Sequence, residues 1–311
     1  MNTSLGANIH PLFRLAGIIT GRLRRLALAG ATVLLASCSA LQLGYNQAHT
    51  VLYWWIDGYA DLNDAQSAHL RKDLDALLGW HRQQELPVYA QQLQQWRALA
   101  AHDLTADQVC REVDVLSAAA GRLIERAQEP LARLALTLTP AQRAHLQRHH
   151  EKGNAGFEKD FVRGSDAQRL ERRLERTRDR YESLYGPLTA QQTDLIRQDL
   201  RTSPFDAARS LEQRRERQAE MQTLVAELQA SQARPLAAHE APPRAAVRRV
   251  QAWLQRGLLP TTGEEERADW VRHGCAAFAR LHNSTTPPQR RHAQQVLQGY
   301  EADLRALAAQ R

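Results

Sequence analysis

The chain has 311 residues, of which 43% are hydrophobic and 24% are charged, and its formal net charge is +7 at pH 7. Four of the 41 basic residues lie in the first 37 residues, so 37 basic residues face 34 acidic ones in the remainder. This near balance argues against a nucleic-acid-binding protein, which needs a concentrated basic surface. The remainder is long enough to bury a sizeable core, as one large domain or two small ones.

Residues 1–37 have the features of a secretory signal peptide. The first 25 residues carry four arginines and no acidic residue, and an apolar run of eleven residues follows, Leu26–Ala36. Eleven residues are too few to cross a bilayer as a helix. The run ends in a Leu-small-small-Cys pattern that resembles the lipobox of bacterial lipoproteins, Leu35-Ala36-Ser37-Cys38. We therefore predict cleavage before Cys38 and lipidation of its thiol; the alternatives are an ordinary signal peptide and an uncleaved anchor.

A lipidated Cys38 would place the protein on a membrane, because a multiply acylated cysteine is a stable anchor. Ser39 follows it, and the lack of an aspartate there resembles lipoproteins that are sorted to the outer membrane. We expect residues 38–44 to form a short tether and the rest of the chain to face the periplasm. In that oxidising compartment, the remaining pair Cys110 and Cys275 can form a disulfide; the alternative is two reduced, buried thiols.

Residues 45–311 are expected to form one all-α domain, an elongated bundle of about ten helices. Alanine, leucine, glutamine, arginine and glutamate dominate these residues and favour helices, and no segment alternates apolar and polar residues as a strand would. Pro87 should kink a helix or start a new one, and glycines at 153–156 can interrupt another. Three prolines make 231–243 the best candidate for a break between sub-domains.

A local pattern marks many of the expected helix starts. In a capping box, a threonine or asparagine oxygen accepts an N–H of the first helical turn, and a glutamine three residues later accepts the N–H of the cap residue. The glutamines are spaced irregularly, which excludes a strict solenoid repeat. The boxes begin at the cap residues Asn63, Thr105, Thr139, Thr189 and, more weakly, Thr286.

Two resemblances accompany these patterns. Leu-Thr-x-x-Gln boxes are similar to those of Spy/CpxP-type periplasmic chaperones, although only the boxes match. A broader resemblance is to a family of proteobacterial lipoproteins of unknown function, domain of unknown function 6279; it implies an all-helical envelope lipoprotein and no activity. The lipobox and four further segments carry it: Tyr45-Asn46, Tyr53-Trp54-Trp55-x-Asp57-x-Tyr59, Asp61-Leu62 and Trp80-His81-Arg82-x-x-Glu85-Leu86-Pro87-x-Tyr89.

Two segments are candidate interaction surfaces. The aromatic segment Tyr53–Tyr59 is expected to pack in the core, and its alternative is a belt at the membrane interface; Asp57 needs a hydrogen-bonding partner if it is buried. The arginine-rich helix predicted over 166–185 is expected to be a solvated face of ion pairs, or else to contact anionic lipid phosphates. The residues assigned to these surfaces are Tyr53, Trp54, Trp55, Asp57, Tyr59, Arg172, Arg173, Arg176 and Arg180.

Other chemistry has little support in the sequence. His145 and His149 are spaced to share a helix face beside His150 and Glu151, but no third metal ligand is evident, so we predict no metal site. The sequence contains no serine nucleophile elbow and no glycine-rich phosphate loop, so we predict no catalytic residue and no cofactor.

We expect a non-enzymatic scaffold or adaptor that binds an envelope protein through a helical surface. A chaperone of the Spy/CpxP type is the first alternative, and an enzyme that acts on envelope polymer is the second. The oligomeric state is left open.

Overall fold

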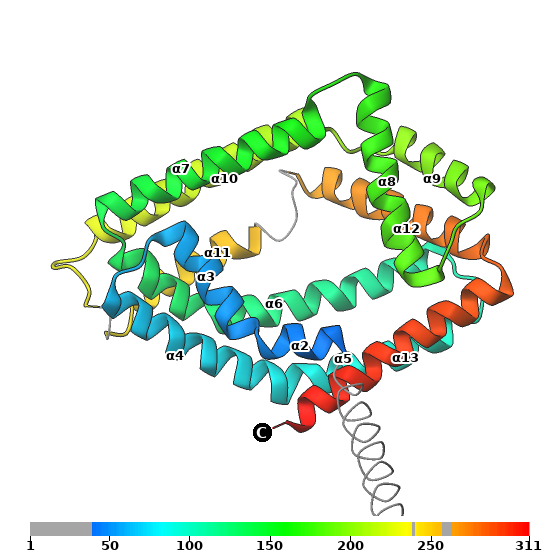
Figure 1. Ribbon diagram of the computed structural model, residues 1–311. Helices are drawn as coiled ribbons and strands as arrows, with labels where there is room; N and C mark the ends of the chain where they lie inside the picture. The colour runs from blue at the N-terminus through cyan, green and yellow to red at the C-terminus, as the bar shows by residue number, and fades with distance from the viewer. Residues whose placement is uncertain (1–38, 238–239, 257–262, 311) are drawn as a thin grey trace, which may run out of the picture. The chain divides into compact units, whose positions relative to one another are not determined.

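The computed structural model of the protein describes residues 39–237, 240–256 and 263–310 (Figure 1). Every regular element in these ranges is helical, which confirms the predicted all-α, multi-helix fold. None of the described helices is both long and apolar enough to cross a bilayer. The predicted signal peptide and the predicted lipid anchor at Cys38 lie outside the described residues.

The chain divides into two compact units, the first ending at Gln47 and the second beginning at Ala48. The described part of the first unit contains α2 (Ala40–Asn46). Its N-cap is Ser39, whose side chain accepts the N–H of Gln42 at 3.1 Å. The tether expected over residues 38–44 is therefore helical in large part, because a serine cap starts a helix there.

The second unit contains all the other described helices. In chain order they are α3 (Ala48–Ala60), α4 (Asp64–Trp80), the π-helical η1 (His81–Glu85), α5 (Leu86–Leu99), α6 (Ala106–Thr137), α7 (Pro140–Phe157), the π-helical η2 (Glu158–Val162), α8 (Asp166–Tyr185), α9 (Ala190–Thr202), α10 (Ala207–Ala230), α11 (Arg244–Arg256), α12 (Glu264–Asn283) and α13 (Pro287–Ala309).

The helices begin where local sequence predicts them. All five predicted capping boxes are formed, with both reciprocal hydrogen bonds present in each. A sixth box, Ser165 with Gln168, starts α8; the sequence pattern missed it because its cap is a serine that follows a glycine, whereas the predicted boxes have threonine or asparagine caps. The side chain of each cap satisfies an N–H that has no partner within the helix.

One detail differs from expectation. Glycines do not interrupt α7, which runs unbroken to Phe157 before the π-helical turn η2 begins. Pro87 lies in the first turn of a new helix, α5, which is one of the two predicted alternatives, and η1 joins α4 to α5 without a loop. The segment 231–243, our candidate for a sub-domain break, lies inside the second unit.

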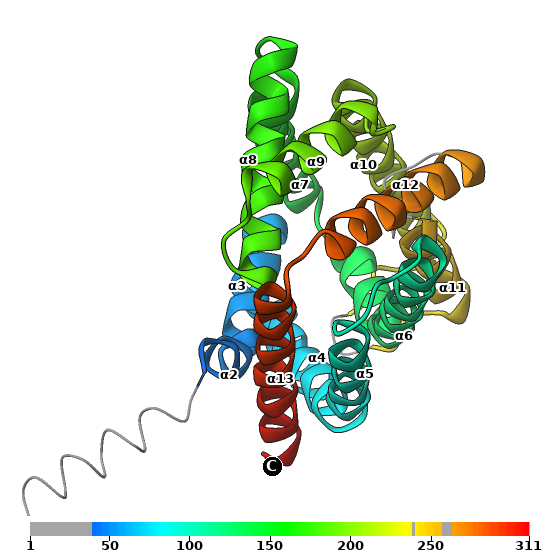
Figure 2. The ribbon, with the colours of Figure 1, turned by 90° about the vertical axis from the view of Figure 1, so that its right-hand side faces the viewer.

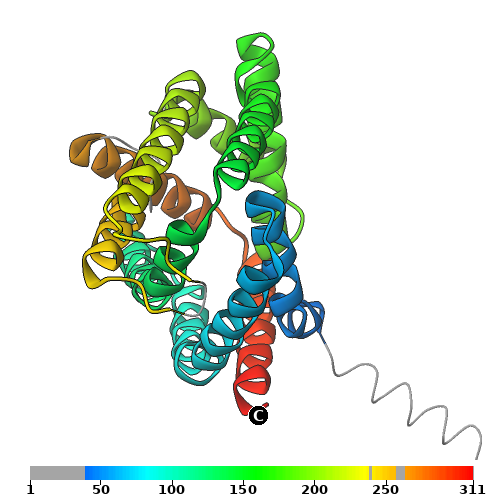
Figure 3. The ribbon, with the colours of Figure 1, turned by 90° about the vertical axis from the view of Figure 1, so that its left-hand side faces the viewer.

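The core of the second unit consists of several small clusters between neighbouring helices. Figure 2 shows α5 beside α13, where Leu93 packs with Leu297. Figure 3 shows α4 and α3 together, and α3 also contacts α7. A third cluster joins α8, α9 and α12 through three buried residues, Leu174, Ile196 and Leu281. The last of these clusters lies next to the candidate site described below.

Candidate functional site

Four of the six capping boxes meet in pairs. Gln66 and Gln142 exchange side-chain hydrogen bonds of 3.2 and 2.7 Å, and we call this contact the first junction. Gln192 and Gln289 exchange two bonds of 2.9 Å, which form the second junction. All four glutamines are at most 8% exposed. Each glutamine thus belongs both to its own helix start and to the start of a helix far away in the chain.

The two junctions share one pattern of backbone contacts. Each glutamine amide also donates to a carbonyl two residues before the cap of its partner box: Gln66 to Thr137, Gln142 to Asp61, Gln192 to Ser284 and Gln289 to Pro187, at 2.7–3.1 Å. The helices around them correspond as well. Around the first junction, α3 contacts α4 and α7, and α4 contacts α6. Around the second junction, α8 contacts α9 and α13 in the same way, and α9 contacts α12.

Asp57 has a structural partner within this pattern. Its carboxylate accepts the N–H of Leu62 at 2.9 Å, just before the cap of α4. Glu182 accepts the N–H of Leu188 at 3.2 Å in the corresponding place before α9. We therefore assign Asp57 to the fold of the first junction.

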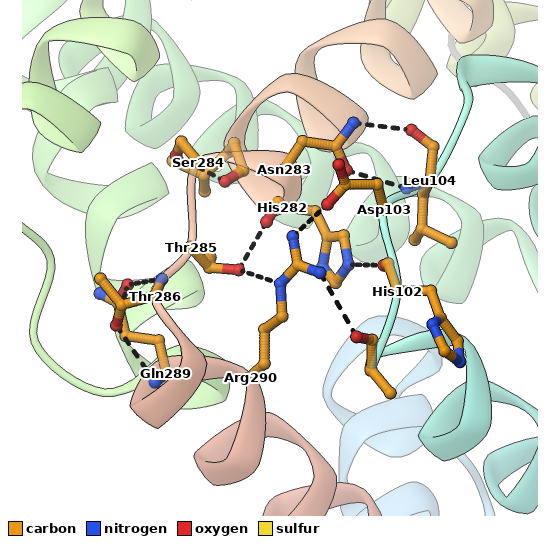
Figure 4. A network of polar contacts seen from close by, with 12 residues as sticks. His102, Asp103, Leu104, His282, Asn283, Ser284, Thr285, Thr286, Gln289 and Arg290 are labelled. Carbon is orange, nitrogen blue, oxygen red and sulfur yellow. Dashed lines mark hydrogen bonds and ion pairs between the residues drawn. The ribbon is translucent and has the colours of Figure 1, made fainter.

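A polar network extends the second junction (Figure 4). His282 is 1% exposed, and its Nε2 lies 2.7 Å from the carbonyl oxygen of His102. A carbonyl can only accept, so Nε2 carries the proton and Nδ1 accepts from the hydroxyl of Tyr185 at 2.8 Å. Burial lowers the pKa of His282, so the neutral ring is favoured.

The remaining members of this network join the loop before α6 to the turn between α12 and α13. Arg290 pairs with Asp103 and donates to Thr285 Oγ1 at 3.2 Å. The Asn283 side chain exchanges two hydrogen bonds with the backbone of Leu104, at 2.8 and 2.9 Å. The side chains of His282, Asn283 and Arg290 are all bonded to other parts of the fold, which gives the cluster a structural role.

The aromatic segment on α3 is divided between interior and surface. Tyr53 is 6% exposed; its hydroxyl donates to Ser67 Oγ at 3.1 Å and the Arg71 guanidinium lies 3.6 Å from its ring centre. Trp54 and Trp55 are each 61% exposed. The expected core packing is therefore right for Tyr53 and wrong for the two tryptophans. Conversely, Tyr53 is removed from the candidate interaction surface, because a buried ring cannot form one.

The rest of the aromatic segment contacts α7. Tyr59 is half-buried, and its ring centre lies 3.9 Å from that of His149. His145 Nε2 lies 3.0 Å from the carbonyl oxygen of Gly58. No group of three potential metal ligands occurs among the residues that the structure describes. These histidines contact α3, which is a packing role.

The four candidate arginines of α8 have two different roles. Arg172 donates to the carbonyl oxygens of Asp160 and Arg163, so it holds the turn after η2 in place. We therefore remove it from the candidate interaction surface. The other three are spaced so that they share one face of α8, and all of them line a cavity: Arg173, Arg176 and Arg180.

The cavity has a volume of about 550 Å³ and is bounded by α8, α9, α12 and the first turns of α6. Its walls are mainly apolar and aromatic, and include Phe161, Phe205, Trp270 and Phe278. The Arg173 guanidinium lies 4.8 Å from the ring centre of Phe205, and that of Arg176 lies 4.5 Å from Phe161. Sequence analysis identified the arginines but missed the aromatic walls, because these come from other parts of the chain.

A disulfide forms part of the cavity wall. Cys110 of α6 and Cys275 of α12 are bonded, with their Cα atoms 5.4 Å apart and a separation of 165 positions in the chain. Cys275 is 2% exposed and lines the cavity. Of the two alternatives for these cysteines, the structure contains the bridge.

One ion pair with a buried carboxylate was not anticipated. Glu85, at the end of η1, is 3% exposed and accepts two hydrogen bonds from the Arg122 guanidinium, at 2.8 and 2.7 Å. This guanidinium holds the pKa of Glu85 below its usual value. The pair fixes η1 against α6, and only the tertiary fold brings the two residues together.

Comparison with known proteins identifies the class of this chain without giving it an activity. Residues 58–237 match the family of unknown function DUF6279, so the chain belongs to that family. No curated protein and no solved structure matches the chain. The match begins on α3 and includes both glutamines of the first junction, α8 and α9.

Proposed function

We propose that the protein is a non-enzymatic adaptor of the bacterial outer membrane. In this proposal, a lipidated Cys38 and the apolar face of α3 hold it on the lipid surface, and the other helices are presented to an envelope protein in the periplasm. The observation that carries the proposal is the α3 face, formed by Val51, Trp54 and Trp55, which are 60%, 61% and 61% exposed. Large apolar side chains grouped on a surface mark a site of interaction.

A lipid surface suits this face for two reasons. Tryptophan is enriched at membrane interfaces, where its ring is half in the apolar layer and half in water. In addition, α3 begins at Ala48, ten residues after Cys38. Ten residues span at most about 35 Å, so a lipid attached at Cys38 would keep α3 near the bilayer.

The polar clusters support a binding role over the two alternatives. The box glutamines at the junctions are buried against each other, so they offer no surface to a chaperone client. The buried histidine and the buried glutamate described above are likewise bonded to the fold.

Lipid quenching of tryptophan fluorescence tests the proposal. The processed, lipidated protein would be placed in vesicles whose acyl chains are brominated, because bromine quenches only tryptophans within the bilayer interface. We expect strong quenching for the wild type. The double change Trp54→Phe and Trp55→Phe removes the reporters and keeps an apolar face, so most of the quenching should disappear.

A matched control uses another tryptophan of the same unit that lies away from α3 and from the cavity. Trp253 is half-buried and lies on α11, so Trp253→Phe should leave the quenching unchanged. Quenching that persists in the double variant would show that α3 does not touch lipid. A photoreactive residue at position 54 that crosslinks to a protein in cells, with no quenching in vesicles, would also overturn the membrane contact.

A further inference from the structure

The cavity beneath α8 has no part in the proposed membrane contact. Its volume of about 550 Å³ is within the range of about 300–1,000 Å³ that is usual for small-molecule sites. Its lining is mainly apolar, and its three arginines lie on one helix, whereas Asp199 of α9 and His273 of α12 contribute further polar groups. This is the arrangement of a site that holds an apolar body and fixes one charged end.

The charge around the cavity is positive. Arg173 and Arg180 have no ion-pair partner among the described residues. Arg176 pairs with Asp160 at 3.1 Å through one nitrogen, whereas its Nη1 is buried with no hydrogen-bond partner in the described part of the chain. The lining carboxylate, Asp199, is already paired with Arg280.

An unpartnered, buried guanidinium N–H is unfavourable, and an anion is the partner that would satisfy it best. Arg173 also donates to the carbonyl oxygen of Leu200 at 3.4 Å and lies over Phe205, so it is held at the cavity without being neutralised. Positive charge and an apolar lining are thus adjacent.

We propose that this cavity binds an amphiphile with one anionic headgroup, a phosphate or a carboxylate, on the three arginines of α8, and with a single alkyl chain among the aromatic walls. The ligand class follows from charge complementarity at the rim and from the apolar interior. The inference does not depend on the proposed adaptor role or on contact between α3 and lipid.

Photolabelling tests the site in the intact protein. The lipidated protein would be placed in uncharged phosphatidylcholine vesicles with a dodecyl phosphate that carries a diazirine at the end of its chain. We expect the label on the peptides of α12 and α9 that line the cavity. Unlabelled dodecyl phosphate or dodecanoate should compete at least tenfold better than dodecyl maltoside, which lacks the charge, and than inorganic phosphate, which lacks the chain.

A cavity-filling variant tests the location. Gly274 lines the cavity, and a Cβ atom placed on it would meet nothing within 4 Å, so Gly274→Leu fills space without a clash at its base. Its control is Gly299→Leu on α13, where a Cβ is equally free. We expect labelling of the cavity peptides to fall about tenfold in the first variant and to be unchanged in the second.

Charge variants test the headgroup site. Arg173→Gln with Arg180→Gln should weaken competition by dodecyl phosphate about tenfold and leave that of dodecyl maltoside unchanged. Arg178→Gln removes an arginine of the same helix that does not line the cavity, so it should have no effect. Two results would overturn the proposal: labelling that is insensitive to Gly274→Leu, and equal competition by inorganic phosphate and dodecyl phosphate, which would indicate a plain anion site. Preference between the phosphate and carboxylate competitors identifies the source of the anion.

Discussion

The change Gln192→Ala should destabilise the protein far more than the same change in an unpaired capping box. Gln192 is 2% exposed and its side chain takes part in four hydrogen bonds: one with the N–H of Thr189, two with Gln289, and one with the carbonyl oxygen of Ser284. A buried hydrogen bond contributes roughly 1 kcal/mol net, and a partner left unsatisfied costs more. We therefore expect a loss of about 3–4 kcal/mol.

The comparison is Gln108→Ala. Gln108 occupies the same box position on α6, but among the described residues it bonds only with Thr105. Its loss should reduce the free energy of unfolding by about 0.5–1 kcal/mol, the usual range for a surface cap. The two glutamines have the same local sequence pattern, so any difference between them measures the junction.

Urea unfolding of the disulfide-bonded protein, followed by circular dichroism, gives both values. The double variant Gln192→Ala with Gln289→Ala should lose about 1–2 kcal/mol less than the sum of the two single variants, because either change removes both mutual bonds. If Gln192→Ala costs no more than Gln108→Ala, or if the two junction variants are additive, the glutamine pair does not hold the helices together.

Three further predictions concern other parts of the second unit. Because burial lowers the pKa of His282, the unfolded chain binds a proton at this ring more readily than the folded chain does. The free energy of unfolding should therefore be highest above about pH 6.5 and should decrease as the pH falls below this value. Unfolding in urea at pH 7.5 and 5.5 checks this. Replacing Cys110 and Cys275 by alanine frees a loop of 165 residues in the unfolded chain, so the free energy of unfolding should drop by about 3–5 kcal/mol; equal stability of the oxidised and reduced wild type would contradict this. Glu85→Gln breaks a charge pair whose carboxylate is buried, so the free energy of unfolding in urea should fall by about 2–4 kcal/mol. Most of this difference from the wild type should disappear at pH values below the pKa of the glutamate, because the wild type then loses the charge too.

Local signals predicted the helix boundaries well. The capping boxes at Asn63, Thr105, Thr139, Thr189 and Thr286 are interactions within four residues, so the sequence contains all the atoms that form them. The contacts between boxes of different helices could not be predicted. The partner glutamines are 76 and 97 residues apart, and only the packing of whole helices brings them into contact.

The candidate surfaces show the same limit. Helical spacing places Tyr53 on a different side of α3 from Trp54 and Trp55, and residues on different sides of a helix rarely have the same exposure to solvent. The spacing alone could not show which side faces the core. The three arginines that line the cavity are recognisable from their spacing along α8. The opposite wall, with Trp270 and Phe278, lies about a hundred residues later, so the cavity itself had no signature in the sequence.

The two junctions also set an order of assembly. A chain is synthesised from its N-terminus, and the first junction is complete once Gln142 has been made, while the second must wait for Gln289. During the interval, Gln192 has its own helix start but no partner. The early helices can therefore reach their native contacts first, and the cavity, which needs α12, forms only when nearly all of the described residues have emerged. Interrupted synthesis would thus leave the helices of the first junction without the cavity.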